Sequence, residues 1–139
     1  MLRRSTGFKN ALLGTNAFSA ILANCYINIY SGTQPASADS AASGVLLMTI
    51  TADGGGLNFD TPSAGVIAKD STDWLGTGIA EGVAGWFRLY ENTDDPALAS
   101  TTKARIDGQI AISGAEWNMS STAISVGSIL EVYSFTYGL

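Results

Sequence analysis

Short runs in which apolar and polar residues alternate recur along the chain, and they predict strands rather than helices. The run 26–30, YINIY, alternates strictly, as a half-buried strand does. The run 45–51 carries apolar residues on both faces, which is typical of a central strand. About seven to nine such runs follow at intervals of about 8–12 residues, the spacing of an all-β sandwich. We therefore predict an antiparallel β-sandwich over residues 26–139, with a jelly roll as one form of it.

The longest pattern is a hairpin over residues 82–112, whose two strands flank a polar insert at 91–102. Its first strand turns Phe87 and Leu89 toward the predicted core, and its second strand turns isoleucines at 106, 110 and 112 the same way. The opposite face of the hairpin carries Trp86, Arg88, Tyr90, Arg105, Asp107 and Gln109. Matching the apolar faces places Arg88 opposite Asp107 and predicts a cross-strand ion pair.

The row formed by Trp86, Arg88 and Tyr90 is a candidate binding surface. Trp, Tyr and Arg are the residue types enriched at the centres of protein interfaces. A second sheet or a loop of the same chain lying over the row would explain the same pattern. Both interpretations remain open at this point.

The remaining runs predict short edge strands at 57–60 and 65–69 and a final strand over 128–137. In the final strand Tyr133, Phe135 and Tyr137 fall on one face, while Leu130 and Val132 fall on the other. A strand that continues to the end of the chain stays ordered only when it is tied into a sheet. We therefore expect this aromatic strand to be part of the sandwich.

Residues 1–25 precede the first strand and are predicted to form a separate arm with a short helix. Ser5 or Thr6 is the candidate N-cap, the helical pattern breaks at 14–16, and a second short turn follows. Three of the seven cations lie within the first nine residues, which favours contact with an acidic partner. The interface candidates in this arm are Arg3, Arg4, Phe8 and Lys9. The arm either docks on a neighbouring subunit or folds over its own domain.

The charge balance narrows the classes of partner. The formal net charge is −5 and no basic stripe is present, so we expect no nucleic-acid partner. No apolar run is long enough to span a membrane, and no secretory signal is evident, so we expect synthesis in the cytosol and no membrane contact. Charged residues make up only 14% of the chain, which suggests that part of the surface is covered by other protein.

The residue inventory argues against enzymatic chemistry. The chain has no His and one Cys, Cys25, which excludes a Ser-His-Asp triad, a Cys-His pair and Cys/His zinc sites. We expect Cys25 to be a buried thiol. Asp70 and Asp73, beside Trp74, are the remaining candidates for a catalytic carboxylate pair, but their position is more typical of turn residues. Oxygen groups at 91–95 would suit Ca²⁺, but their spacing matches no EF-hand loop. We predict no catalytic residue, no cofactor and no metal.

Five short motifs, taken in order, resemble small virion proteins of tailed phages and prophages. They are IYSGTQPASAD at 29–39, ASGVLL at 42–47, GWFRL at 85–89, RIDGQ at 105–109 and SGA at 113–115. The resemblance covers most of the chain from residue 26 onward. It implies a non-enzymatic protein on the capsid surface of the virion that decorates or cements the capsid by bridging subunits of the major capsid protein.

The resemblance also allows a head–tail or tail component. We expect a cement protein of this kind to act as a small homo-oligomer. The competing hypothesis is a carbohydrate-binding β-sandwich of a tail adhesin, because a sugar ring stacks on an exposed indole. Trp74, Trp86 and Trp117 are the candidate stacking platforms.

Overall fold

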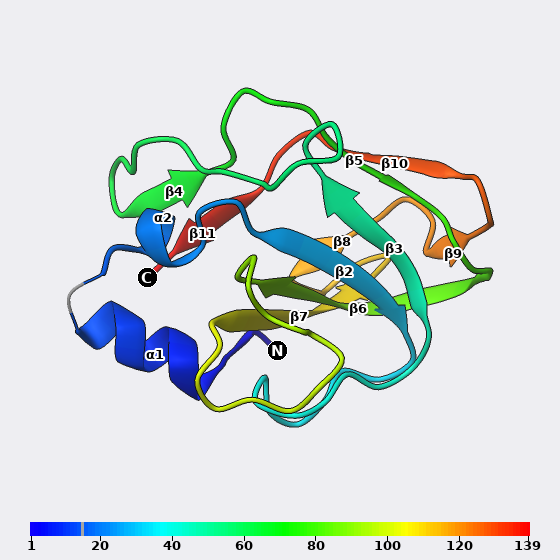
Figure 1. Cartoon of the computed structure of the whole chain (residues 1–139). Helices are drawn as coiled ribbons and strands as arrows, with labels where there is room; N and C mark the ends of the chain where they lie inside the picture. Colours follow the sequence, from blue (N-terminus) through cyan, green and yellow to red (C-terminus); the bar gives the residue numbers. More distant parts are fainter. Residues whose placement is uncertain (15) are drawn as a thin grey trace.

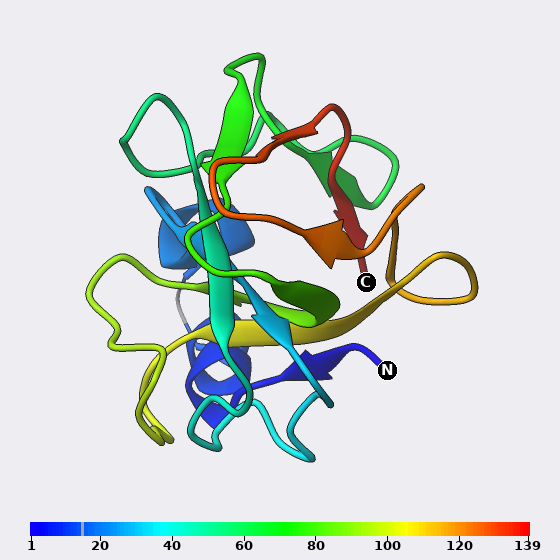
Figure 2. The same cartoon turned by 90° about the vertical axis from the view of Figure 1, so that its right-hand side faces the viewer.

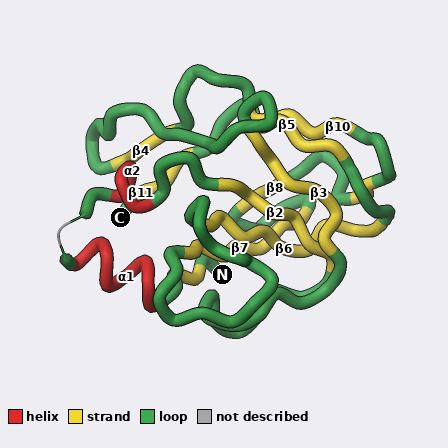
Figure 3. Tube along the Cα trace, viewed as in Figure 1, coloured by secondary structure: helices red, strands yellow, loops and turns green. Residues whose placement is uncertain are grey.

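The chain folds as an all-β sandwich with two short helices near its N-terminus, seen in a computed structural model that describes residues 1–14 and 16–139. Figure 1 shows both helices on one side of the strands, and Figure 3 separates helices, strands and loops by colour. The helices are α1 (Thr6–Leu13) and α2 (Phe18–Ile21). The strands are β1 (Arg3–Arg4), β2 (Tyr26–Ser31), β3 (Leu46–Thr51), β4 (Val66–Ala68), β5 (Trp74–Thr77), β6 (Gly82–Tyr90), β7 (Arg105–Ala111), β8 (Trp117–Asn118), β9 (Ala123–Ile124), β10 (Ile129–Val132) and β11 (Thr136–Gly138).

The described strands form one large sheet and one small sheet. The large sheet has the order β1-β7-β6-β2-β3-β5-β10, with β8 added beside β7 and β9 beside β6. Its pairs are antiparallel except β7–β8, and β11 pairs with β4 to make the small sheet. Figure 2 shows the C-terminal segment lying across from β6 and β7. The sandwich prediction is confirmed, with one large and one small sheet rather than the two similar sheets of a jelly roll.

The predicted hairpin and its register are confirmed. In the β6–β7 pair Arg88 stands opposite Asp107, and Phe87 stands opposite Gly108. Phe87, Leu89 and Ile106 point into the core. Ile112 was predicted to share that core face, but β7 ends at residue 111 and Ile112 is exposed. The buried apolar face of the hairpin therefore ends at Ile110, two residues earlier than the alternation indicates.

The strand at 26–31 is buried on both faces, so the predicted half-buried strand is wrong in this detail. β2 lies between β6 and β3 in the middle of the large sheet. Its polar-face residues Asn28 and Tyr30 are buried as fully as Ile27 and Ile29 are. The sequence pattern fixes which residues share a face, but it does not report what covers that face.

Of the two interpretations of residues 1–25, folding over their own domain is the one observed, and the boundary placed at residue 26 divides segments that share one core. β1 pairs with β7, and the Ser5 hydroxyl caps α1 by accepting a hydrogen bond from the Phe8 amide at 3.1 Å. The Phe8 ring is buried in the core. Gly7 lies so close to the chain at Thr102 that an added Cβ would be 2.4 Å from its backbone. The first described residues are therefore part of the sandwich. The predicted helix break at 14–16 includes residue 15, which lies outside the described residues.

The predicted final strand is split in two. β10 pairs with β5 in the large sheet, whereas β11 pairs with β4 in the small one. Phe135 leads into the small sheet, where its carbonyl accepts a hydrogen bond from the Lys69 amide. The change of sheet ends the alternation, so Tyr133 is 83% exposed while Tyr137 is buried. The prediction that these aromatic residues share one face is wrong for Tyr133.

Candidate binding surfaces

Trp86, Arg88 and Tyr90 lie inside the molecule, so the prediction that they form an outer surface is wrong. Trp86 and Arg88 have no exposed surface, and Tyr90 is almost as deeply buried. Two loops of the same chain, at 32–45 and 91–104, fold over this face of the hairpin. Of the two interpretations that the sequence left open, coverage by the same chain is correct.

Two buried ion pairs hold these loops down. Arg88 binds both carboxylate oxygens of Asp107 through one guanidinium edge, from Nε at 2.7 Å and from Nη2 at 2.8 Å. Arg105 binds Asp94 in the same way, at 2.6 and 2.8 Å. Such bidentate pairs are short and directional because both groups are charged. We call these four residues, Arg88, Asp107, Arg105 and Asp94, the loop clamp.

The guanidinium groups of the clamp also bind loop carbonyls. Arg88 donates to the carbonyl of Ser40 at 3.0 Å and to that of Pro96 at 2.9 Å, so one side chain ties both loops. Arg105 donates to the carbonyl of Asp95 at 3.1 Å. Burial raises the pKa of the Asp107 carboxyl, and the Arg88 guanidinium opposes that rise. The clamp is a closed structural network that leaves no reacting group open to a substrate.

Aromatic packing completes the covered face. The Tyr30 ring stacks on Trp86 with centroids 4.5 Å apart, and the Arg88 guanidinium lies 5.3 Å from the Trp86 centroid. The Trp86 indole nitrogen donates to the carbonyl of Ser43 at 3.3 Å. Tyr90 donates from its hydroxyl to the Asn28 side chain at 3.2 Å, and burial raises the pKa of its phenol. The residue types that mark interface centres here pack against the protein's own loops.

The N-terminal cations contact their own sandwich to different degrees. The Arg4 guanidinium lies 5.3 Å from the centre of the Tyr137 ring and donates a hydrogen bond to the Tyr137 hydroxyl. Arg3 is partly buried opposite Asp107, and Lys9 is exposed on α1. The three cations line a groove of about 330 Å³ together with Leu2 and residues 36–38. We call this groove the basic groove. Phe8, the fourth predicted contact residue of the arm, is in the core and is not available to a partner.

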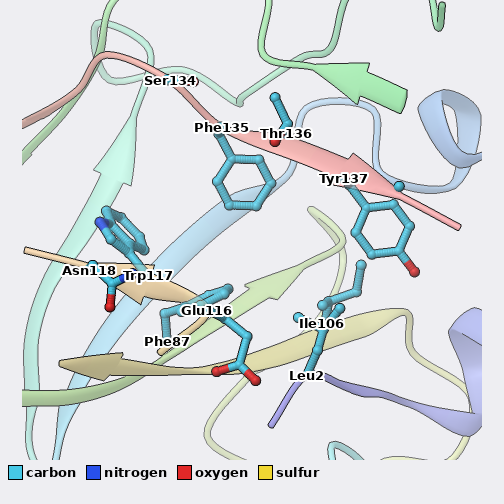
Figure 4. Close-up of a pocket in the computed structure, with 11 residues that line it drawn as sticks. Leu2, Phe87, Ile106, Glu116, Trp117, Asn118, Ser134, Phe135, Thr136 and Tyr137 are labelled. Carbon is cyan, nitrogen blue, oxygen red and sulfur yellow. The ribbon is translucent and has the colours of Figure 1, made fainter. Parts of the chain in front are cut away.

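An aromatic cleft of about 480 Å³ opens between the hairpin and the C-terminal segment, and Figure 4 shows its lining side chains. The rings of Phe87 and Trp117 approach from the large sheet, with centroids 5.5 Å apart. Phe135 and Tyr137 approach from the opposite wall. The polar lining residues are Glu116, Asn118, Ser134 and Thr136. A cleft of this size with a few polar groups suits a small ligand or one sugar ring.

Glu116 is the charged group of the aromatic cleft, and it is already paired. Its carboxylate binds the N-terminal amine of Met1 at 2.8 Å and accepts from the Gln109 amide at 3.1 Å. Partial burial acts to raise the pKa of the Glu116 carboxyl, but these hydrogen bonds outweigh it and hold the pKa below its ordinary value. Glu116 is therefore an ionised acceptor rather than a proton donor at neutral pH.

The structure separates the three candidate sugar platforms. Trp74 and Trp86 are completely buried, which contradicts their role as stacking platforms. Trp117 is partly exposed in the aromatic cleft. Any stacking of a sugar ring on an indole is thus confined to Trp117.

A further exposed feature is an apolar patch where the turn at 78–82 meets the turn at 125–128. The Gly78 amide donates to the carbonyl of Ser128, and the Gly127 amide donates to the carbonyl of Gly78, each at 2.8 Å. Four aliphatic side chains at this end, Ile79, Val83, Val126 and Ile129, are between 62% and 72% exposed. We call these four residues the apolar end. The two turns that carry these residues lie at the end of the fold opposite α1 in Figure 1, the side that faces the viewer in Figure 2.

The predictions on metal and carboxylate chemistry meet different outcomes. Asp94 is buried in the loop clamp, so it is not part of a solvated loop tip or of a Ca²⁺ site open to solvent. Asp70 accepts from the Thr72 amide at 3.1 Å, as a turn residue does. Within residues 1–14 and 16–139, no group of three or more acidic, Cys or His residues is placed to hold a metal ion. Cys25 is buried as predicted, and burial raises the pKa of its thiol to about 12.

Comparisons with known proteins give no relative for this chain. No model of a known protein family matches it, and neither a curated protein nor a solved structure does. Among the described residues, no helix is long and apolar enough to cross a membrane. The choice of function therefore depends on the surfaces described above and on the motif resemblance.

Proposed function

We propose that this protein is a non-enzymatic structural component of a tailed-phage virion that decorates or cements the capsid by bridging subunits of the major capsid protein. The virion assignment comes from the five motifs in the sequence. The physical support is that the domain exposes two unlike surfaces, the basic groove and the apolar end, while the loop clamp holds its loops in place. A cement subunit has to present contact surfaces without changing its own shape.

The observation that carries the proposal is that two exposed surfaces of different chemistry lie at opposite ends of the sandwich. The basic groove, with Arg3, Arg4 and Lys9, lies beside α1. The apolar end lies on the far side of the sheet. A subunit with two unlike ends can hold two neighbours at once. We assign the basic groove to an acidic surface of the major capsid protein, because the attraction of unlike charges favours that encounter.

Immunogold electron microscopy on purified particles from the source of the gene tests the location. An antibody against the chain should label capsid shells at many positions. Label confined to the tail or to the head–tail junction would replace the cement role with the tail or head–tail alternative. Particles without label would contradict a virion role altogether.

Rebinding to particles stripped of the protein tests the basic groove. The variant Lys9→Glu changes an exposed side chain and should leave folding unchanged while it lowers particle occupancy, most strongly at low salt. Asn92→Glu is the control, because it adds a negative charge at an exposed position that lies outside the groove. Equal occupancy of the two variants would contradict this use of the groove.

The aromatic cleft supports a second candidate function, the binding of a sugar by a tail adhesin. The observation that favours it is the partly exposed Trp117 indole beside polar groups in a cleft of about 480 Å³. Stacking of a sugar ring on an indole does not specify which sugar binds, so a glycan array is the suitable screen. Binding that is lost in Trp117→Ala and kept in Lys9→Glu would support the adhesin role. No bound glycan at millimolar concentration would exclude it.

A further inference from the structure

We propose that the basic groove binds an extended acidic segment of a partner protein, which adds to the large sheet as a further strand beside β1. The inference deepens the proposed function and rests on it for the identity of the partner, because the groove is the surface assigned above to the major capsid protein. It adds the backbone conformation of the bound segment and the spacing of its acidic residues.

The cations of the basic groove are the ones that the fold leaves without an ion pair. Of the seven cations in the chain, three outside the groove bind carboxylates, and Lys69 donates to two backbone carbonyls. Within residues 1–14 and 16–139, Arg3, Arg4 and Lys9 make no ion pair. Arg3 stands opposite Asp107, but both oxygens of that carboxylate are already bound in the loop clamp. The positive charge of the groove is therefore available to a partner.

The outer edge of β1 carries free backbone groups. β1 is the last strand at its end of the large sheet, and among the described strands it pairs with β7 alone. The Ser5 amide donates to the Arg105 carbonyl at 2.9 Å, and bonded pairs alternate along an antiparallel ladder. Arg3 is therefore the next residue bonded to β7, whereas the backbone groups of Leu2 and Arg4 point away from it. Such groups on a sheet edge bind an extended peptide by strand addition.

The basic groove follows this edge rather than one face of the sheet. Adjacent residues of a strand point to opposite faces. Arg4 lies against the Tyr137 ring, while Arg3 lies on the same face as Asp107. Both arginines nevertheless line the groove, and residues 36–38 form its other wall. A strand added beside β1 would lie in the groove between the two arginine side chains.

Charge selects the segment that can pair with this edge. Two arginines on so short a strand discourage pairing with basic or purely apolar segments. Two acidic residues adjacent in sequence would point to opposite faces of the added strand, so one would meet Arg3 and the other Arg4. Acidic residues separated by one position would share a face and reach one arginine. Lys9, which is exposed on α1, adds attraction for an acidic segment. The expected ligand is therefore an extended segment with two adjacent Asp or Glu residues.

Titration of the untagged, ¹⁵N-labelled chain with two capped hexapeptides tests the proposal by NMR. The peptides Thr-Val-Glu-Glu-Val-Thr and Thr-Glu-Val-Glu-Val-Thr have the same composition and charge. We expect the first to bind about threefold more tightly, within the range measured for one exposed ion pair. The Arg4 amide signal should shift more than the Arg3 amide signal, because the Arg4 amide is the one free to bond the added strand.

Three controls separate strand addition from simple attraction of charge. The first peptide with N-methyl groups on both glutamate amides keeps its charge but loses these donors, and it should bind at least about threefold more weakly. Arg3→Gln should remove the preference between the two unmodified peptides. Asn92→Glu changes an exposed residue outside the groove and should leave that preference unchanged. The NMR spectra report in the same experiment that both variants are folded.

Four results would overturn strand addition: no peptide binding at millimolar concentration, equal affinity for the two unmodified peptides, binding that N-methylation leaves unchanged, or binding of tripolyphosphate alone, which would make the groove a phosphate site. The test is separate from the test of the virion role. Peptide binding with the expected preference would stand even if particles were unlabelled. Loss of particle occupancy in Lys9→Glu without any peptide binding would keep the cement role and overturn the added strand.

Discussion

The covered face of the hairpin buries charged side chains, whereas the apolar end exposes aliphatic ones, which is the reverse of the usual arrangement in a folded protein. At the covered face two arginines and two aspartates have buried side chains, each arginine is paired with an aspartate, and both arginines also donate to loop carbonyls. At the apolar end aliphatic side chains are exposed beside an edge strand. Polar groups are inside where loops of the same chain can satisfy them, and apolar groups are outside where no described segment covers them. The difference teaches that residue types typical of interface centres can be internal packing, because the aromatic and arginine row is buried while the uncovered aliphatic residues are exposed.

Removal of residues 1–13 should have the largest effect, because it removes β1, α1 and the buried Phe8 ring together. We expect loss of the cooperative unfolding transition and of dispersed amide signals in NMR spectra. A free arm would leave a folded sandwich after the same deletion. A truncated chain with a native-like spectrum would therefore contradict the integration of the N-terminus into the core.

A milder variant tests the same contact without deletion. Gly7→Ala places a methyl group against the backbone at Thr102, where the space does not exist. It should destabilise the protein although Ala is the better helix former. Ala11→Gly on the same helix is the comparison for intrinsic helix propensity, and a smaller loss in Gly7→Ala than in Ala11→Gly would be evidence against the close approach.

Breaking the loop clamp should have the next largest effect. Arg88→Ala leaves Asp107 buried without its partner and leaves two loop carbonyls without a donor, so we expect a loss of about 3–5 kcal/mol in the free energy of unfolding. Urea unfolding measures it. Arg3→Ala, at a partly exposed arginine near the same aspartate, should cost much less. A loss below about 1 kcal/mol in Arg88→Ala would mean that the pair is hydrated, as surface pairs are.

The register of the hairpin and the Arg88–Asp107 pair were predictable because they follow from local alternation in two neighbouring strands. The coverage of that pair was not predictable. It depends on loops at 32–45 and 91–104 that are small, polar and without periodicity, so nothing in their sequence states where they fold back. One clue was available in the sequence. The hairpin contains two arginines, Arg88 and Arg105, and two aspartates, Asp94 and Asp107, so each positive side chain has a negative partner with which it can be buried.

The packing of the N-terminus and the split of the C-terminal strand could not be predicted, for related reasons. The apolar spacing of α1 identifies a helix and its Ser5 cap, but Phe8 packs in a core made mostly of distant residues. Tyr133 breaks the alternation because the chain changes from the large sheet to the small one after β10. Local pattern reports the conformation of a segment, and the partner of that segment is set by contacts far away in the sequence.

Alkaline pH should weaken the covered face before it affects the apolar end. Burial raises the pKa of the Tyr90 phenol above its ordinary value of 10.0. Above about pH 10 the unfolded chain releases this proton while the folded chain keeps it, so the contribution to stability is complete below pH 10 and is lost as the pH rises further. Tyr90→Phe should reduce the fall in unfolding free energy between pH 9 and about pH 11. If the unfolding free energy of Tyr90→Phe falls with pH as steeply as that of the parent chain, Tyr90 does not contribute to the pH dependence.

The smallest effect on stability should come from the apolar end itself. Val126→Ser changes a side chain that is 70% exposed, so the free energy of unfolding should stay within about 0.5 kcal/mol in dilute solution. A loss well above this limit would place Val126 in the core of the single chain.

Hydroxyl-radical footprinting in dilute solution tests the central contrast most directly, because it reports side-chain exposure residue by residue. We predict that Trp86 is protected, since its own chain covers it, and that Tyr133, which is 83% exposed, is oxidised rapidly. Rapid oxidation of Trp86, or protection of Tyr133, would contradict the account.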